Sequence, residues 1–363
     1  MEKHYINKNL RIKGDAGSGR FAWRSPSNIA IVKYWGKYGV QLPSNPSLSF
    51  TLSEATTTMD LSWAMKDKPS ENIEIDFFFE NKEAPKFKTK IEAFLNSIQD
   101  VFPFLKQLEL EFNSTNTFPH SAGIASSASS MSALALCLCS LEKEIFEGKA
   151  GELTDQEFLQ KASYIARLGS GSACRSLYPH AATWGEFGQE GSSKFYASAY
   201  TKLHEVFKTY CDSILIVSSG EKPVSSRAGH ALMKDHPFSD VRFSNARANL
   251  DKLTWALENG ELDEFGVILE REALELHGLM MNSNPSFILM RPNTLSIIEK
   301  VRAFRAQTKC PLYFTLDAGP NVHLLYPKAV EKQVREFIQS DLLEHCEGQQ
   351  VIHDFVGTGP LDL

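Results

Sequence analysis

The sequence predicts an α+β protein of two subdomains, each a mixed sheet packed against helices. In the first half, segments with strand patterns come before the helices. In the second half, helical patterns dominate from about residue 239 to 308, with short apolar strand candidates on either side. Between the halves lies a stretch rich in Gly and Ser, residues 185–198. We place the boundary inside it, giving subdomains of residues 1–192 and 193–363.

The elements of the first half follow from apolar patterns between breakers. Strands are expected at residues 47–53, 56–64, 72–79 and 108–112, and helices at 86–105, 125–146 and 154–168. Thr154 and Glu157 have the spacing of a capping box, which predicts the start of the third helix. Gly169 should end it.

The second half begins with a buried-strand candidate at 211–219, and residues 261–280 have the period of an amphipathic helix. Residues 311–327 predict two strands joined by a tight Asp-Ala-Gly-Pro turn. A last helix is expected at 328–343 and a short strand at 351–356.

Composition excludes several classes of protein. The net charge is −6, which gives no electrostatic support for a nucleic-acid partner. The six cysteines form no CxxC pair, which favours reduced thiols and a cytoplasmic protein, and the histidines form no zinc motif. The first twenty residues lack a signal-peptide core, and the longest apolar run, 131–141, is too short to span a bilayer. We therefore expect a soluble protein.

Residues 118–130 enter a helix through a run of Ser, Ala and Gly. The N–H groups at a helix N-terminus attract anions, and small side chains let a phosphate approach them. Gly123 and Ala125 would supply the clearance, while Ser126 and Ser127 would supply hydroxyls for a phosphate or Mg²⁺. A helix packed closely against a neighbour explains the same residues equally well.

Four further motifs carry charge in unusual surroundings. Lys33 and Lys37 lie in the apolar segment 27–37, which indicates an anionic partner, although lysines at a strand edge often extend to solvent. Arg175 in "GSGSACRS" and Arg227 in "VSSR" could each bind a carboxylate or phosphate, or lie in ordinary surface loops. Asp317 in "DAGPNV" is typical of a turn, and it becomes a candidate base if a cation approaches it.

Together, "NIAIVKYWGK", "PSNPSLSFTLS", "AGIASSAS", "GSGSACRS", "VSSR" and "YFTLDAGPNV" resemble, in order, the motifs of mevalonate diphosphate decarboxylases in the GHMP kinase superfamily. The resemblance extends from about Ser25 to Tyr326, and "KYWGK" with "GSGSACRS" is its most specific part. It implies a ribosomal-S5-domain-2-like N-terminal part, a ferredoxin-like C-terminal part and an active site in the cleft between them. It also implies ATP- and Mg²⁺-dependent decarboxylation of (R)-5-diphosphomevalonate to isopentenyl diphosphate, by a homodimer.

Carried over position by position, the resemblance implies that Asp317 acts on the tertiary 3-hydroxyl, with Lys33 beside it and Arg175 on the substrate carboxylate. It implies further substrate-binding roles for Asn28, Tyr34, Lys37, Ser172, Ser226 and Arg227. The ATP phosphate loop would contain Gly123, Ala125, Ser126 and Ser127, with Ser127 near the metal.

The sequence departs from the usual family pattern at Pro46, at His120-Ser121 and at Pro179-His180, where a Gly-Gly pair is commoner. Two alternatives stay open. One is a relative that uses another phosphorylated mevalonate or stops after phosphorylating the 3-hydroxyl. The other is a GHMP-fold module that binds ligand without catalysis. A homoserine or galactose kinase is disfavoured by "KYWGK" and "DAGPNV".

Overall fold

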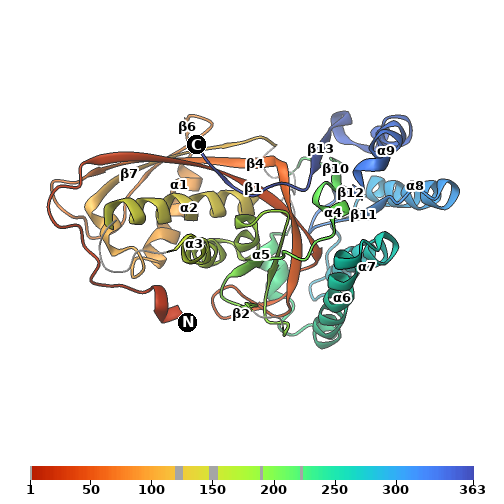
Figure 1. Cartoon of the computed structure of the whole chain (residues 1–363), viewed down its shortest axis with the longest axis horizontal. Helices are drawn as coiled ribbons and strands as arrows, with labels where there is room; N and C mark the ends of the chain where they lie inside the picture. The colour runs from red at the N-terminus through yellow and green to blue at the C-terminus, as the bar shows by residue number, and fades with distance from the viewer. Residues whose placement is uncertain (1, 119–125, 147–153, 189–190, 221–223) are drawn as a thin grey trace.

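The computed structural model describes residues 2–118, 126–146, 154–188, 191–220 and 224–363, with the backbone only at 2, 3, 226 and 227. Figure 1 shows two halves, one built on the long strands β1, β4 and β7 and the other carrying helices α6 to α9. The strands are β1 (Ser18–Val32), β2 (Lys37–Tyr38), β3 (Leu42–Pro43), β4 (Ser47–Met65), β5 (Asp76–Phe79), β6 (Lys82–Glu83), β7 (Leu108–Asn116), β8 (Ala181–Trp184), β9 (Ala197–Ala199), β10 (Cys211–Leu215), β11 (Tyr313–Thr315), β12 (Val322–Tyr326), β13 (Val351–Phe355) and β14 (Leu361–Asp362). The helices are α1 (Pro85–Ser97), α2 (Ser126–Phe146), α3 (Asp155–Gly169), α4 (Glu205–Lys208), α5 (Ser226–Ala231), α6 (Ser239–Asn259), α7 (Leu262–Met281), α8 (Pro292–Thr308) and α9 (Glu331–Phe337).

The first sheet has the order β14-β1-β4-β7-β5-β6, with β8 and β9 added beside β4. The two strands predicted at 47–53 and 56–64 form the single strand β4. Its pairing with β1 shifts register between Pro26 and Asn28, which leaves a bulge in β4. The buried Asp354 carboxylate accepts hydrogen bonds from the N–H groups of Ser53, Glu54 and Ala55 in that bulge, at 2.7 to 2.8 Å. This carboxylate, far away in the sequence, therefore satisfies the backbone N–H groups of the bulge, and β4 continues as one strand across it.

Other predicted boundaries differ locally. The helix expected at 86–105 ends at Ser97, and a separate 3₁₀ turn follows at Pro103–Gln107. Pro103 disfavours the helical conformation at Phe102, so one helix could not have continued to residue 105. The strand expected at 72–79 is confirmed only for Asp76–Phe79, which pairs in parallel with β7. The capping box at Thr154 and the end of α3 at Gly169 are confirmed.

Helix α2 packs against the first sheet on one side and α3 on the other, so much of its surface is buried. Its small residues permit this close approach. Ser129 and Ser132 are fully buried, and their hydroxyls lie 2.6 Å from Thr57 Oγ1 and 2.5 Å from Ser25 Oγ. Close packing therefore accounts for these small residues of α2, whereas residues 119–125 lie outside the described part of the chain.

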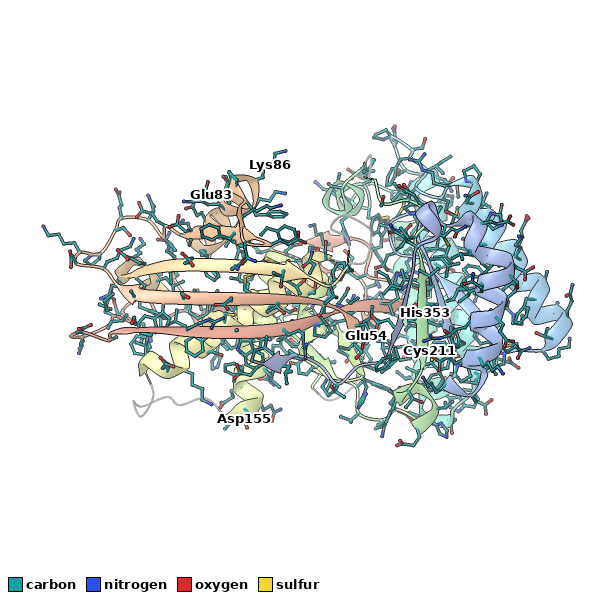
Figure 2. The ribbon with its side chains drawn as sticks, turned by 90° about the horizontal axis from the view of Figure 1, so that it is seen from above. Glu54, Glu83, Lys86, Asp155, Cys211 and His353 are labelled. Carbon is teal, nitrogen blue, oxygen red and sulfur yellow. The ribbon has the colours of Figure 1, made fainter. Side chains whose placement is uncertain are left out.

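The second sheet has the order β11-β12-β10-β13 and carries a separate core beneath α8 and α9. In Figure 2, the strand with Cys211 runs across the direction of β1 and β4, and Glu54 lies where the long strands reach the second half. The predicted strands around the Asp-Ala-Gly-Pro turn are confirmed as β11 and β12. A third core, between β1, β4, α6 and α7, joins the halves.

Two short strands beyond residue 192 add to the first sheet. β9 pairs with β8, and β14 at the end of the chain pairs with β1. The boundary between residues 192 and 193 stays a prediction. Among the described helices, none is both long and apolar enough to cross a bilayer.

Candidate active site

A cavity of about 260 Å³ lies where the two halves meet. It is bordered by the end of β1 and the segment after it, by the 3₁₀ helix Gly171–Leu177, and by α5, α7 and the turn after β11. The lining residues are Asn28, Ala30, Lys33, Tyr34, Trp35, Lys37, Gln41, Ser127, Gly169, Ser170, Gly171, Ser172, Arg175, His230, Leu276, Asp317 and Ala318. Most of the residues predicted for the site therefore converge there.

Lys33 and Asp317, which are far apart in the sequence, form an ion pair with Lys33 Nζ 3.1 Å from Asp317 Oδ1. The lysine side chain is 2% exposed and the aspartate 26%. Burial lowers the pKa of Lys33, and the Asp317 carboxylate opposes that shift. His277 Nε2 lies 3.0 Å from the Asp317 carbonyl oxygen, which ties the turn to α7.

The backbone of Lys33 is held by a buried charge network. Glu272 accepts a hydrogen bond from the Lys33 N–H at 2.8 Å, and Arg242 and Asn45 both donate to the Lys33 carbonyl at 3.0 Å. Arg242 and Glu272 form a two-pronged ion pair, and both side chains are almost completely buried. Helices α6 and α7 therefore fix the position of a lysine that comes from the first half.

Arg175 is buried among neutral partners. Its guanidinium donates to Ser49 Oγ at 2.9 Å, to Ser47 Oγ at 2.7 Å and to Asn28 Oδ1 at 3.4 Å. It forms no salt bridge with the described residues, and burial lowers its pKa. A guanidinium that lines a cavity with only neutral partners is suited to binding an anion there.

Tyr34 fills one wall of the cavity. Its ring centroid lies 4.6 Å from that of Trp184 and 4.3 Å from that of His230. Its buried hydroxyl has no hydrogen-bond partner among the described residues, and burial raises the pKa of Tyr34, so the hydroxyl remains protonated. Gly171 is needed beside it, because a Cβ there would lie 2.9 Å from the Tyr34 hydroxyl oxygen.

The remaining predicted residues fall into three groups. Lys37 donates to Gln41 Oε1 at 2.9 Å, Ser172 accepts from Asn28 Nδ2 through its carbonyl at 3.2 Å, and Ser127 Oγ lies 3.2 Å from Ser170 Oγ. Ser126 begins α2 and is not among the lining residues. Gly123, Ala125 and the side chains of Ser226 and Arg227 lie outside the described part of the structure.

Several residues of this site were not predicted from the sequence. Ser47 and Ser49 alternate in a strand pattern, and two serines on one face of a buried strand were a signal for polar partners inside. Glu272 and His230 gave no local signal, since each acts on a segment far away in the chain.

A bound Mg²⁺ is compatible with the residues present. The described residues contain no group of three His, Cys, Asp or Glu side chains that could hold a metal by themselves. Mg²⁺ keeps several waters and commonly relies on substrate phosphates for its remaining ligands, so few protein ligands suffice. The exposed Ser127 hydroxyl lies at the cavity and is an oxygen of the kind that Mg²⁺ binds.

Comparison with protein families gives two matches that follow each other along the chain. Residues 25–196 match the diphosphomevalonate decarboxylase-like N-terminal domain, and residues 213–358 match the mevalonate 5-diphosphate decarboxylase C-terminal domain. The diphosphomevalonate decarboxylase of Candida albicans is 28% identical over 324 residues, covering 85% of this chain and 85% of that protein. The enzyme of the same name from Rattus norvegicus is 28% identical over 342 residues, covering 86% and 77%.

Solved structures agree with these matches. The mevalonate diphosphate decarboxylase of Staphylococcus aureus has a TM-score of 0.79 at 26% identity, covering 96% of this chain and 98% of that one. The Enterococcus faecalis enzyme has a TM-score of 0.79 at 27% identity, covering 95% and 99%. A structure described as MDDEF in complex with MVAPP, AMPPCP and magnesium has a TM-score of 0.78 at 28% identity, covering 95% and 99%. The cavity, its buried charges and these likenesses along nearly the whole chain place the protein in the mevalonate diphosphate decarboxylase family.

Proposed function

We propose that this protein catalyses the ATP-dependent decarboxylation of (R)-5-diphosphomevalonate to isopentenyl diphosphate, ADP, phosphate and CO₂. The observation that carries the proposal is the Lys33–Asp317 ion pair in a cavity shared with Arg175. The related complex with MVAPP, AMPPCP and magnesium supports the choice of substrate, nucleotide and metal.

Asp317 is proposed to accept or orient the proton of the tertiary 3-hydroxyl. Hydroxide leaves a tertiary carbon poorly, so the oxygen must first become a phosphate ester. Transfer of a phosphoryl group depends mainly on positioning and charge neutralisation, and a carboxylate fixed at 3.1 Å from Lys33 Nζ meets the first requirement. Lys33 would hold the carboxylate in its ionised form and contribute positive charge beside the transferred group.

Arg175 is proposed to bind the substrate carboxylate. When phosphate leaves, positive charge develops at C3, and the electrons of the breaking carbon–carboxylate bond neutralise it as CO₂ departs. Because Ser47 and Ser49 hold the Arg175 guanidinium, it can orient the carboxylate and stay in place when CO₂ leaves. Catalysis requires that the enzyme bind the transition state more tightly than the ground-state carboxylate. Fixed neutral partners for Arg175 favour this difference.

The nucleotide is proposed to lie at the start of α2, with Ser127 as a ligand of Mg²⁺. Bound Mg²⁺ would neutralise charge on the phosphates of ATP. Ser170, which shares a hydrogen-bond contact with Ser127, would keep that hydroxyl at the edge of the cavity. Asn28, Tyr34, Lys37 and Ser172 are proposed to face the substrate, with Ser226 and Arg227 at its diphosphate.

The experiment that tests this function supplies ATP and Mg²⁺ with mevalonate, its 5-phosphate or its 5-diphosphate. We expect CO₂, ADP and isopentenyl diphosphate from the diphosphate alone. A phosphate ester without CO₂, or turnover of another mevalonate, would contradict the proposal. In Asp317→Asn, we expect kcat to fall by about 10² to 10⁴-fold with a smaller change in KM, because the general base is removed. Asn in place of the exposed Asp67 is the control, and it should leave kcat unchanged.

The proposal also includes a homodimer, a cytoplasmic location and a domain boundary between residues 192 and 193. Six cysteines without disulfides support a reducing compartment. Sedimentation of the purified protein tests the dimer, and imaging of a fluorescent fusion tests the location. Limited proteolysis followed by mass spectrometry tests whether cleavage between the domains occurs in the segment around residue 192.

A further inference from the structure

His230 lies on α5 and lines the cavity, although the residues assigned above leave it without a role. The residue is 8% exposed. Its ring centroid lies 4.3 Å from that of Tyr34 and 4.5 Å from that of Trp35. Both aromatic neighbours restrict the plane and position of the imidazole.

One hydrogen bond determines which ring nitrogen carries the proton. The Gly36 N–H donates to His230 Nδ1 at 3.0 Å, and a backbone N–H can only donate. Nδ1 therefore carries the lone pair, and the proton of the neutral ring lies on Nε2. Burial and the charge of Lys37 lower the pKa of His230 to about 3, so the ring is neutral at physiological pH.

Within the described part of the chain, the ring's hydrogen bond is the one from Gly36 to Nδ1, and the Nε2–H group has no partner. Nε2 is not fully buried, and it belongs to a residue that lines the cavity. A ligand in the cavity can therefore reach it. A fixed donor at a cavity wall can donate to water when the cavity holds no ligand, and it is positioned to donate to an acceptor on a bound ligand.

The donors around His230 indicate the chemistry of that ligand. Lys37 also lines the cavity, and it lies close enough for its charge to act on the ring. An ammonium and an imidazole N–H together match a group with several anionic oxygens. The Lys33–Asp317 pair and Arg175 are proposed to hold the reacting end of the substrate, which leaves the diphosphate for this wall.

We propose that His230 is a substrate-binding residue that donates from Nε2 to an oxygen of the substrate diphosphate and favours diphosphate over monophosphate. This inference depends on the proposed function for the identity of the substrate. It does not depend on turnover, because the same donor should recognise inorganic pyrophosphate.

Two substitutions separate the two nitrogens of the ring. In His230→Asn, the side-chain oxygen can replace Nδ1 as the acceptor for Gly36, and the cavity donor is lost. In His230→Gln, the amide N–H can replace Nε2, and the acceptor for Gly36 is lost. We expect KM for diphosphomevalonate to rise about 10-fold or more in His230→Asn, with KM for ATP unchanged, since a hydrogen bond to a charged group is lost. His230→Gln should lie closer to wild type. Thermal midpoints of both variants show whether each is folded under the assay conditions.

The binding of inorganic pyrophosphate is measured by calorimetry on the full chain, with AMPPCP and Mg²⁺ present to fill the nucleotide site. We expect the affinity for pyrophosphate to fall about 10-fold or more in His230→Asn, and the affinity for orthophosphate to change less. Equal affinities in wild type and His230→Asn would overturn the proposal, as would a loss confined to His230→Gln, which would indicate a structural role toward Gly36. If wild type fails to turn over diphosphomevalonate while the pyrophosphate difference holds, the proposed function fails and the His230 site stands.

Discussion

Replacing Glu272 with Gln tests the buried network beneath Lys33. Glu272 is fully buried and accepts four hydrogen bonds, from both terminal nitrogens of Arg242, from Asn249 and from the Lys33 backbone. All four partner groups are donors, and each carboxylate oxygen of Glu272 accepts from two of them. The NH₂ group of glutamine would therefore face two donors in either orientation of the amide.

The magnitude follows from this geometry. Removing one charge from a buried ion pair costs about 3–5 kcal/mol, because the other charge remains buried without compensation. Glu275 lies 3.0 Å from Arg242 Nη1 and is 26% exposed, so it retains part of the compensation. We therefore expect the free energy of unfolding to fall by about 3 kcal/mol, at the lower end of the range.

The measurement is urea unfolding, followed by tryptophan fluorescence and by circular dichroism, whose agreement tests two-state behaviour. Glu275→Gln is the matched control on the same helix with the same partner, and it should cost less than about 1 kcal/mol because its side chain is partly solvated. A Glu272→Gln variant within about 1 kcal/mol of wild type would refute the reasoning. It would mean that Arg242 finds another acceptor or water when the charge is removed.

Three further outcomes are expected. Gly171→Ala should lower the free energy of unfolding by about 1–3 kcal/mol and raise KM for the substrate, because the new Cβ would lie 2.9 Å from Tyr34. Gly278→Ala on helix α7, where nothing lies within 4 Å of the new Cβ, should stabilise by about 1 kcal/mol in the same urea measurement. His180 has a φ of 59° and a buried Nδ1 without a partner among the described residues, so His180→Gly should raise the free energy of unfolding by roughly 1 kcal/mol, and a loss of stability would contradict this. Burial lowers the pKa of Lys33, so the alkaline limb of the kcat/KM profile should lie below about pH 10.4, and a limb at or above that pH would refute the assignment. Stability should change in the opposite direction to activity, because the unfolded state binds more protons between the two pKa values of Lys33, so the free energy of unfolding rises with pH there.

Local signals predicted those parts of the fold that depend on local chemistry. The capping box at Thr154 and the strand–turn–strand around Asp317 are properties of a few adjacent residues, and both are confirmed. The fusion of two predicted strands into β4 depends on Asp354, which is about 300 residues away. Likewise, Pro26 and two arginines interrupt the apolar pattern of β1, and this segment forms a strand because β4 pairs with it. No local pattern could contain that information.

The candidate site divides in the same way. Lys33, Arg175 and Asp317 were identified because their motifs resemble a family, and the structure places all three at one cavity. His230 and Glu272 were missed because their importance lies in contacts with backbone groups of a distant segment, Gly36 and Lys33. A backbone N–H is present at every residue except proline, so sequence gives no indication of which one will need a distant acceptor.

Arg175 connects the stability of the fold to its function. Burying a guanidinium among neutral hydroxyls is costly, and Ser47, Ser49 and Asn28 recover only part of that cost through hydrogen bonds. A carboxylate beside a buried guanidinium compensates its charge within the protein, as Glu272 does for Arg242. The two arginines therefore differ in whether a protein carboxylate compensates their charge. The charge of Arg242 is balanced within the protein and holds Lys33 in position. We propose that an anionic ligand balances the charge of Arg175, and its binding would then stabilise the folded state.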